Sequence, residues 1–535
     1  MKSKIRGTLL IAGTIIFYLI FFRNLLGLNT VLFSLFIVGS LAYLFPVRMR
    51  RTEALLASAG LLFSSVIVMW HSSSMAVFVW VSSLVLLQPM VHYPKLRSMF
   101  WASLTAFIDY ITVFDHLQNT ETKINPKNNR FNRLWRTTKL ALIPIIVLLI
   151  FYFIFREANP VFEKLTTNFF NSINEFLEKY FKVISFMDLI FLLWGFITLT
   201  WILLDKTKDH IAGKEEKFKE TIRRKRPAGK LNKVSYLSKG SLKPRLKNEY
   251  RTGLMLMVMV NALLLMVNII DINWVWFNFE YNEGFDLSQF VHEGTYLLIL
   301  SILLSMGIML YFFRKNINFY HKKKNLQTAA GIWIIQNIVL VISVALRNMH
   351  YINNFGLAYK RIGVFFFLTL VIFGLVTLFF KIKNNKTLFY LLKLNSWALW
   401  AGFILFAIPD WDIIIAKNNI GTEIKKETDL KFLMQLDAKA YPIIDKNIET
   451  LAEPGDNFYV YRLGYTTFKY AFYNKVQNFI TEYEKRRFTE FNYADKKSYD
   501  YLKSKYGKDK KYANPLLPEE VDSIAPYLKD TILQD

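Results

Sequence analysis

Long apolar runs recur along this chain, and they constrain its fold more than any other feature. A helix needs about 20 mostly apolar residues to cross a hydrocarbon core of about 30 Å, and many of the runs approach that length. Hydrophobic residues make up 53% of the 535 residues, well above what a soluble chain of this length would carry. The pattern predicts an all-α protein, a polytopic transmembrane helical bundle.

We predict about 11 spans. A further apolar stretch, residues 100–108, is too short to cross a bilayer and is expected to lie in the interface or to pack on the bundle. The predicted spans are Leu9–Phe22, Val31–Phe45, Ala54–Trp70, Met75–Val91, Leu140–Phe155, Ile184–Leu204, Leu254–Ile270, Thr295–Phe313, Ala329–Leu346, Val364–Phe380 and Leu388–Ile408.

The first span resembles a signal peptide, because a basic start precedes an apolar run. The next stretch of small residues, "GSLAY", lies inside the second apolar run and offers no convincing cleavage site. We therefore predict that Leu9–Phe22 is retained as the first helix.

Basic loops alternate with neutral or acidic loops. Residues 205–253 hold 16 Lys/Arg against 6 Asp/Glu, whereas residues 271–294 hold no Lys or Arg against 5 acids. The positive-inside rule then predicts a cytoplasmic N-terminus and an extracytoplasmic C-terminus. The basic loop at 205–253 has few aromatic residues to stack on bases, so anionic lipids of the bilayer are the expected partners and nucleic acid is not.

Composition divides the chain into three parts. Residues 1–139 form a predicted membrane sub-bundle of four spans with a basic cytoplasmic loop, and residues 140–408 form the main bundle of seven spans. Residues 409–535 hold 20 Lys/Arg against 21 Asp/Glu, so the net charge of +26 belongs to the membrane part. Apolar and aromatic residues at helical intervals in this tail predict a small helical extracytoplasmic module.

Motifs of familiar enzymes are missing. The sequence holds no cysteine, no phosphate-binding P-loop, no glycine-rich dinucleotide fingerprint and no Gly-x-Ser-x-Gly elbow. "HEGTY" at His292 is not a zinc-protease motif, because position 296 is Tyr and not His. We therefore expect no cofactor and no metal.

A layer of polar residues is predicted near the outer membrane face. If the end of the ninth span stays helical, residues 347, 350, 351 and 354 share one face. Gly356 then ends the helix, since glycine tolerates a positive φ. The candidate site comprises His292, Glu293, Arg347, His350, Tyr351, Asn354 and Arg361.

Two interpretations of this layer stay open. In one, charges at span ends anchor helices, and Arg347 pairs with Glu293 to hold two of them together. In the other, the layer lines an outward-facing pocket in which His292 or His350 exchanges protons near neutral pH. The aromatic residues at 274, 276, 277 and 279 are expected to form an interfacial belt. Amides within the spans, at 261, 336 and 337, are expected to make interhelical hydrogen bonds.

Four segments together resemble a known family. They are "REANPVFEKL", "LSQFVHEGTYLLILSILL", "ALRNMHYINNFGLAYKRIGVFFFL" and "IPDWDIIIAKNNI...TDLKFLMQLDAKAYPII". The shared elements are Asn159-Pro160-x-Phe162, Phe290-x-His292-Glu293-Gly294, and Tyr351 followed by Phe355-Gly356-Leu357 and Arg361. The start of the tail, Ile408-Pro409-Asp410, lacks the asparagine of the family pattern.

In these elements the chain resembles the bacterial integral membrane proteins of domain of unknown function 4173 and the related 4153 group. The resemblance covers roughly Arg156 to the C-terminus, and the first four spans add little to it. It implies a multi-pass protein of the bacterial cytoplasmic membrane and no particular activity.

Together these observations predict an integral membrane protein with a structural, binding or sensory role facing outward. An envelope enzyme that acts on a lipid-linked substrate at the outer leaflet is the first alternative. A transporter is the second, although the inner halves of the spans look too apolar for a continuous polar path.

Overall fold

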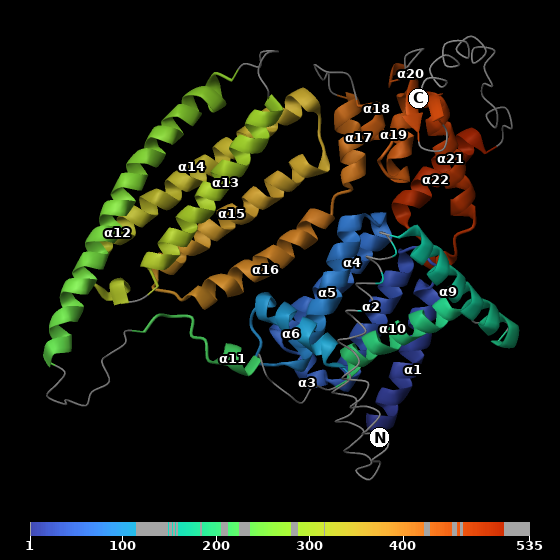
Figure 1. Cartoon of the computed structure of the whole chain (residues 1–535), viewed down its shortest axis with the longest axis horizontal. Coiled ribbons are helices and arrows are strands. Elements are labelled where there is room, and N and C mark those ends of the chain that lie inside the picture. The colour runs from blue at the N-terminus through green and yellow to red at the C-terminus, as the bar shows by residue number, and fades with distance from the viewer. Residues whose placement is uncertain are drawn as a thin grey trace.

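The computed structural model describes residues 2–113, 148, 152, 156, 159–181, 185–204, 212–223, 236–279, 287–314, 316–421, 429–451, 457–460 and 464–507. Figure 1 shows two groups of long helices and a smaller group of short ones above them. Within the described residues the regular elements are helices, apart from one two-stranded hairpin in the tail. The all-α polytopic bundle predicted from the apolar runs is thus confirmed.

Ten of the 11 predicted spans lie in helices. The remaining span, Leu140–Phe155, falls almost entirely outside the described residues. By length and composition, seven described helices could cross a membrane: Thr52–His71, Ser74–His92, Phe186–Leu203, Leu246–Phe277, Lys323–Phe355, Tyr359–Lys383 and Leu388–Ala407. Shorter apolar helices occupy Ile5–Phe21, Leu28–Leu44, Met99–Ile111 and Tyr296–Phe312.

The first bundle surrounds a continuous apolar core. The core is built from side chains that repeat at helical intervals, such as Phe33, Ile37 and Leu41, which are fully buried. The bundle comprises α1 (Lys2–Phe21), α2 (Leu28–Leu44), α3 (Pro46–Met49), α4 (Thr52–His71), α5 (Ser74–His92), α6 (Met99–Ile111) and α10 (Phe186–Leu203).

Helix α10 packs in this first bundle, although its sequence position places it in the second predicted unit. A Cβ atom added at Gly195 would lie 2.6 Å from the ring of Phe17, so the glycine lets α1 approach closely. The sequence stretch just before α10, predicted to be a loop, contains another helix, α9 (Pro160–Phe181). Several of its apolar side chains are exposed, among them Val161, Leu165 and Phe169.

The second bundle has α14 at its centre, packed against α12, α13 and α15. Amide side chains join its helices: the Asn261 amide donates to the Ala329 carbonyl (3.0 Å), and the Asn268 amide donates to the Gln336 carbonyl (3.2 Å). The bundle comprises α12 (Tyr236–Asp271), the π-helix η2 (Ile272–Phe277), α13 (Leu287–Phe312), η3 (Asn316–Phe319), α14 (Lys323–Phe355), α15 (Tyr359–Lys383) and α16 (Leu388–Ala407).

Helix α16 connects the two bundles. It packs on α15 and also on α5 and α6. Its Trp400 ring covers Gly60 so closely that a Cβ atom there would lie 2.1 Å from the ring, and the Trp400 indole N–H donates to the Ser83 hydroxyl (3.1 Å). The short helix α11 (Ala212–Glu216) packs on α6, which also contacts α16.

The tail has its own apolar core, to which Ile362 of α15 also contributes. A hairpin not predicted from the sequence pairs Asn457 with Thr467 and Val460 with Gly464. The elements are α17 (Trp411–Gly421), α18 (Leu430–Leu433), η4 (Ala438–Ala440), α19 (Tyr441–Lys446), α20 (Ile448–Leu451), β1 (Asn457–Val460), β2 (Gly464–Thr467), α21 (Phe468–Glu484), η5 (Phe488–Glu490) and α22 (Tyr493–Tyr506).

The tail docks on the first bundle. The backbone N–H of Leu28 donates to the Phe491 carbonyl (2.9 Å), and the ring of Trp70 stacks on that of Tyr493 with 4.5 Å between centroids. Helices α21 and α22 therefore lie at the end of the first bundle opposite to the N-terminal end of α1 (Figure 1).

Candidate functional site

The predicted polar layer lies where α14 ends. The helix continues to Phe355, so Arg347, His350, Tyr351 and Asn354 share a side of it as the spacing predicts. Gly356 ends the helix with a φ of 77°, as expected for a glycine in this position.

Arg347 forms a buried ion pair with Asp271. Its guanidinium donates to the Asp271 carboxylate at 2.5 Å, and the two side chains are 9% and 5% exposed. Asp271 is the last residue of α12, so the pair holds the C-terminal ends of α12 and α14 together. The side chain of Glu293 lies outside the described residues, and the predicted pair between Arg347 and Glu293 stays a prediction.

His350 contacts the π-helical turn after α12. Its Nε2 lies 2.9 Å from the Val275 carbonyl, which can only accept, so this nitrogen carries the proton. The ring also stacks on Phe279 with 4.3 Å between centroids. The other candidate proton carrier, His292, has a side chain outside the described residues.

Arg361 fastens the loop between α14 and α15. Its guanidinium lies over the Tyr351 ring (4.2 Å) and donates to the carbonyls of Phe355 (2.8 Å) and Gly356. The Asn354 amide donates back to the His350 carbonyl at 2.8 Å. These contacts join the side chains to backbone atoms nearby, and each contact supports the position of a helix end. Residues that anchor a helix are expected to make contacts of this kind.

A second polar cluster lies between the tail and the membrane helices, and sequence reasoning missed it. At its centre is Lys439 of η4, whose side chain is 1% exposed. Its ammonium lies 3.1 Å from the Asp412 carboxylate, 3.3 Å from that of Asp437 and 3.8 Å from that of Asp410. It also donates to the backbone carbonyl of His71, the last residue of α4 (3.0 Å).

The cluster ties three parts of the molecule to one another. Lys439 and Asp437 belong to the tail, His71 ends a helix of the first bundle, and the Tyr359 hydroxyl, at the start of α15, donates to the Asp412 carboxylate. The His71 Nε2 lies 3.0 Å from the Ala407 carbonyl at the end of α16. A shared cluster of this kind fixes the tail relative to both bundles.

Burial and charge shift the titration of these groups. Burial raises the pKa of Asp410 to about 6, and the Asp412 carboxylate adds to that rise. Burial opposes the charged form of Lys439, but the three surrounding carboxylates outweigh it and raise the pKa of this ammonium. Lys439 is therefore protonated at neutral pH and occupies the place that a cation would take among the carboxylates.

A pocket of about 510 Å³ adjoins the cluster, and both polar and apolar side chains line it. Residues from the connection between α1 and α2 form one wall, and residues of η4, α19 and α21 form another. The lining residues are Leu25, Leu26, His71, Ser72, Asp437, Ala438, Lys439, Tyr441, Lys475, Asn478, Phe479, Glu482, Arg486 and Asp495.

Two buried polar atoms of this lining have no hydrogen-bond partner: the Nδ1 of His71 and the Nε of Arg486. Only 2% of the surface of His71 is exposed. Both nitrogens have almost no accessible surface, so they lie behind the surface of the pocket and not in the cavity itself.

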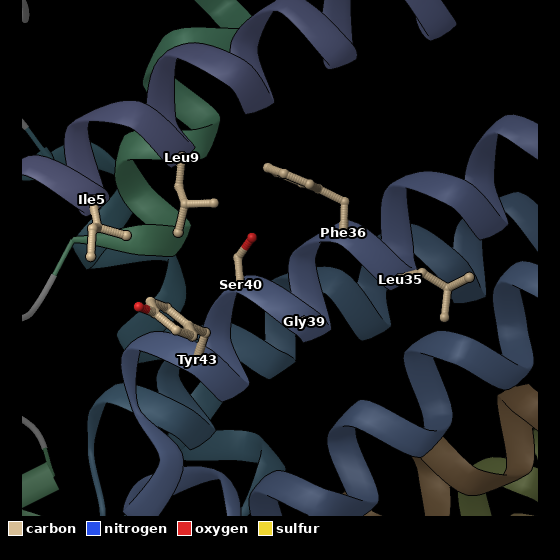
Figure 2. A pocket seen from close by; sticks show the side chains of 7 residues that line it. All are labelled: Ile5, Leu9, Leu35, Phe36, Gly39, Ser40 and Tyr43. Atoms are coloured by element: carbon tan, nitrogen blue, oxygen red, sulfur yellow. The ribbon is translucent and has the colours of Figure 1, made fainter. Parts of the chain in front are cut away.

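A hollow of different character lies between α1 and α2. Figure 2 shows Leu9 and Phe36 on facing helices with Ser40 between them. The hollow has a volume of about 440 Å³ and is lined by Ile5, Leu9, Leu35, Phe36, Gly39, Ser40 and Tyr43. This lining is almost wholly apolar, which suits the packing of lipid chains.

These features define the class of protein: a polytopic helical membrane protein with a tail docked on one end of its bundles. The chain belongs to the family described as "Domain of unknown function (DUF4153)", whose model matches residues 9–447. The match includes the first four predicted spans, to which the sequence resemblance added little, and the narrower 4173 label is not confirmed. No curated protein and no solved structure matches the chain.

The matched region contains every member of the Lys439 cluster, from His71 to Lys439 itself. The family domain therefore includes the part of the tail that docks on the membrane helices. The sequence signal for this cluster is weak, because its members come from four separate segments of the sequence. The one local hint is the spacing of Asp410, Asp412, Asp437 and Lys439 around short helices at the start of the tail.

Proposed function

We propose that this membrane protein is a binding protein that faces outward from the bacterial cytoplasmic membrane. Its ligand is held in the pocket between the tail and the first bundle. The observation that carries the proposal is the pocket of about 510 Å³ where the tail meets the first bundle, with the buried side chains of His71 and Lys439 in its lining. The anchored helix ends around Arg347 and Arg361 serve as the rigid support of that pocket.

The charge pattern supports the proposed orientation. The N-terminal end of α1 and the short helix α3 lie at the end of the first bundle away from the tail (Figure 1), and these helices contain Arg6 and Arg48. Positive loops favour the cytoplasmic side, so the tail faces outward in this arrangement. Anionic lipids are the proposed partners of these basic ends. A relation to the 4173 group remains part of the proposal, supported by the elements around His292 and Tyr351.

The test is native mass spectrometry of the full chain purified in detergent. Asn478 lines the pocket on the exposed side of α21, so Asn478→Trp should fill it. Thr481→Trp, on the same helix but outside the lining, is the matched control. We expect a co-purifying small molecule on the natural chain and on the control but not on Asn478→Trp. Equal amounts on all three chains, or none on any, would contradict the proposal.

A further inference from the structure

Helix α9 carries apolar residues on one side and polar residues on the other. Val161, Leu165 and Phe169 follow one another at four-residue intervals and form an apolar stripe, whereas Thr167 and Asn171 lie on the opposite side. The three side chains of the stripe are 67%, 64% and 61% exposed, so no other part of the chain covers them. A stripe of this kind indicates that a lipid surface or another protein covers it.

Helix α9 does not have the composition of a membrane span. Its sequence contains three glutamates and two lysines, and it is not among the described helices that are long and apolar enough to cross a bilayer. Burying its polar side in hydrocarbon would be costly. The helix can therefore use lipid on one side only, as a helix at a membrane surface does.

The start of α10 indicates where the membrane boundary lies. The 18 residues of α10 extend about 27 Å, so the whole helix is needed to cross a hydrocarbon core of about 30 Å. Its first residue, Phe186, therefore lies at one boundary. Phe186 is also on the same side of α10 as Met187 and Ile190, which are exposed and face away from the first bundle.

Helix α9 meets α10 at this boundary. The ring of Phe170 stacks on that of Phe186, with 5.8 Å between the centroids and 27° between the planes. Phe170 directly follows Phe169 of the stripe, so the apolar side of α9 continues into the exposed side of α10. The lipid that covers this side of α10 is the nearest apolar medium for the stripe.

From these observations we infer that α9 lies on the membrane surface, with Val161, Leu165 and Phe169 inserted among the lipid chains and its polar side in water. The partner is the bilayer surface beside the start of α10, and burial of apolar area holds the helix there. Charge attraction to anionic lipids contributes little, because α9 has one more glutamate than lysines. The inference depends neither on the proposed ligand pocket nor on which side of the membrane the tail faces.

Single cysteines on the two sides of α9 test this arrangement, since the chain has no cysteine of its own. Leu165→Cys and Phe169→Cys probe the stripe. Thr167→Cys and Asn171→Cys, each two residues further along, are the matched controls on the opposite side. All four positions are exposed, so the protein alone would give them similar access to small molecules.

Each full-length variant carries a nitroxide label and is reconstituted into phosphatidylcholine vesicles, with and without phosphatidylglycerol. Electron paramagnetic resonance then measures how often the label collides with oxygen, which concentrates in lipid, and with a water-soluble nickel chelate. We expect the ratio of oxygen to nickel collisions to be several-fold higher for Leu165→Cys and Phe169→Cys than for the controls, in both kinds of vesicle.

Three results would overturn the inference. Equal access of the nickel chelate to all four labels would place α9 in water. Labels on the stripe that neither reagent reaches would show that protein covers it, from a second copy or another segment of the chain. A difference between the two sides that requires phosphatidylglycerol would show that charge, and not apolar burial, holds the helix on the membrane.

Discussion

Charged side chains buried at helix ends fix the positions of neighbouring helices in this molecule. The ion pair between Arg347 and Asp271 is the clearest case, because both side chains are withdrawn from water. Removing one member leaves the other charge buried without its partner, which typically costs about 3–5 kcal/mol. We therefore expect Asp271→Asn and Arg347→Gln each to lower the stability of the detergent-purified chain.

The double substitution should lose less than the two single losses added together, since neither charge is then stranded. Thermal unfolding of the four chains measures this coupling. Lys360→Gln, at an exposed position on the next helix, controls for the loss of a positive charge and should be nearly neutral. Strict additivity would show that Arg347 and Asp271 do not depend on each other.

Asp410 gives a pH-dependent prediction. Its pKa is about 6 in the folded chain, against about 4 for an ordinary Asp, so the folded state binds the proton more tightly than the unfolded state. The stability that Asp410 contributes is present below about pH 4 and is lost as pH rises through about 6. Asp410→Asn should therefore stabilise the chain at pH 7.5, by on the order of 2 kcal/mol, and change little at pH 4.

Asp412→Asn should act in the opposite direction at pH 7.5. Its carboxylate lies 3.1 Å from the Lys439 ammonium and accepts the Tyr359 hydroxyl, so its charge stabilises the junction. Melting temperatures of both variants at the two pH values measure the difference. If Asp410→Asn lost as much stability at pH 7.5 as Asp412→Asn, the raised pKa of Asp410 would be contradicted.

At the scale of elements, the end of α14 depends on one glycine. Gly356 has a φ of 77°, and a Cβ atom there would lie 2.8 Å from the Asn419 side chain of α17. Gly356 also has a ψ of −179°, a backbone conformation that is almost restricted to glycine, so Gly356→Ala should destabilise the chain by about 1–3 kcal/mol through backbone strain alone, and by more if Asn419 is displaced. The measurement is the melting temperature of the purified protein.

Gly363 in α15 is the matched control, because it has helical backbone and no atom within 4 Å of an added Cβ. Gly363→Ala should be neutral or stabilising by up to about 1 kcal/mol, as alanine favours a helix. Similar losses of stability from Gly356→Ala and Gly363→Ala would show that position 356 has no special requirement for glycine.

The positions of the helices could be predicted from the sequence, because an apolar run is a local signal. Ten predicted spans lie in helices, and the stop at Gly356 falls where the sequence indicates. The partners of those helices could not be predicted. Helix α10 packs in the first bundle because Gly195 lets the Phe17 ring of α1 approach closely. The residues of α10 alone do not identify α1 as its partner.

The candidate site shows the same limit. Arg347 and His350 could be placed at one helix end from their spacing, but their contacts with Asp271 and Val275 depend on the π-helical turn of η2. The Lys439 cluster escaped prediction because its residues are far apart in the chain. Each taken alone resembles an ordinary polar residue at a helix end.

At the scale of the whole molecule, the tail and the bundles share buried contacts. Ile362 of α15 completes the tail core, and the Lys439 ammonium is satisfied in part by the His71 carbonyl of α4. Residues 412–535 alone would lose both contacts. We expect that fragment to show no cooperative thermal transition by circular dichroism. A sharp transition in the fragment would show that the tail folds without the bundles.

The pocket between the tail and the first bundle faces outward only if the chain has the proposed orientation, so a measurement of membrane topology tests the proposed function most directly. The sequence contains no cysteine, so a single introduced thiol is the only one that can be labelled. Lys219 in the basic loop and Lys503 in α22 are exposed positions for such substitutions. An impermeant thiol reagent is applied to cells with an intact cytoplasmic membrane. We expect labelling of Lys503→Cys and protection of Lys219→Cys, and the reverse pattern would contradict the proposed orientation.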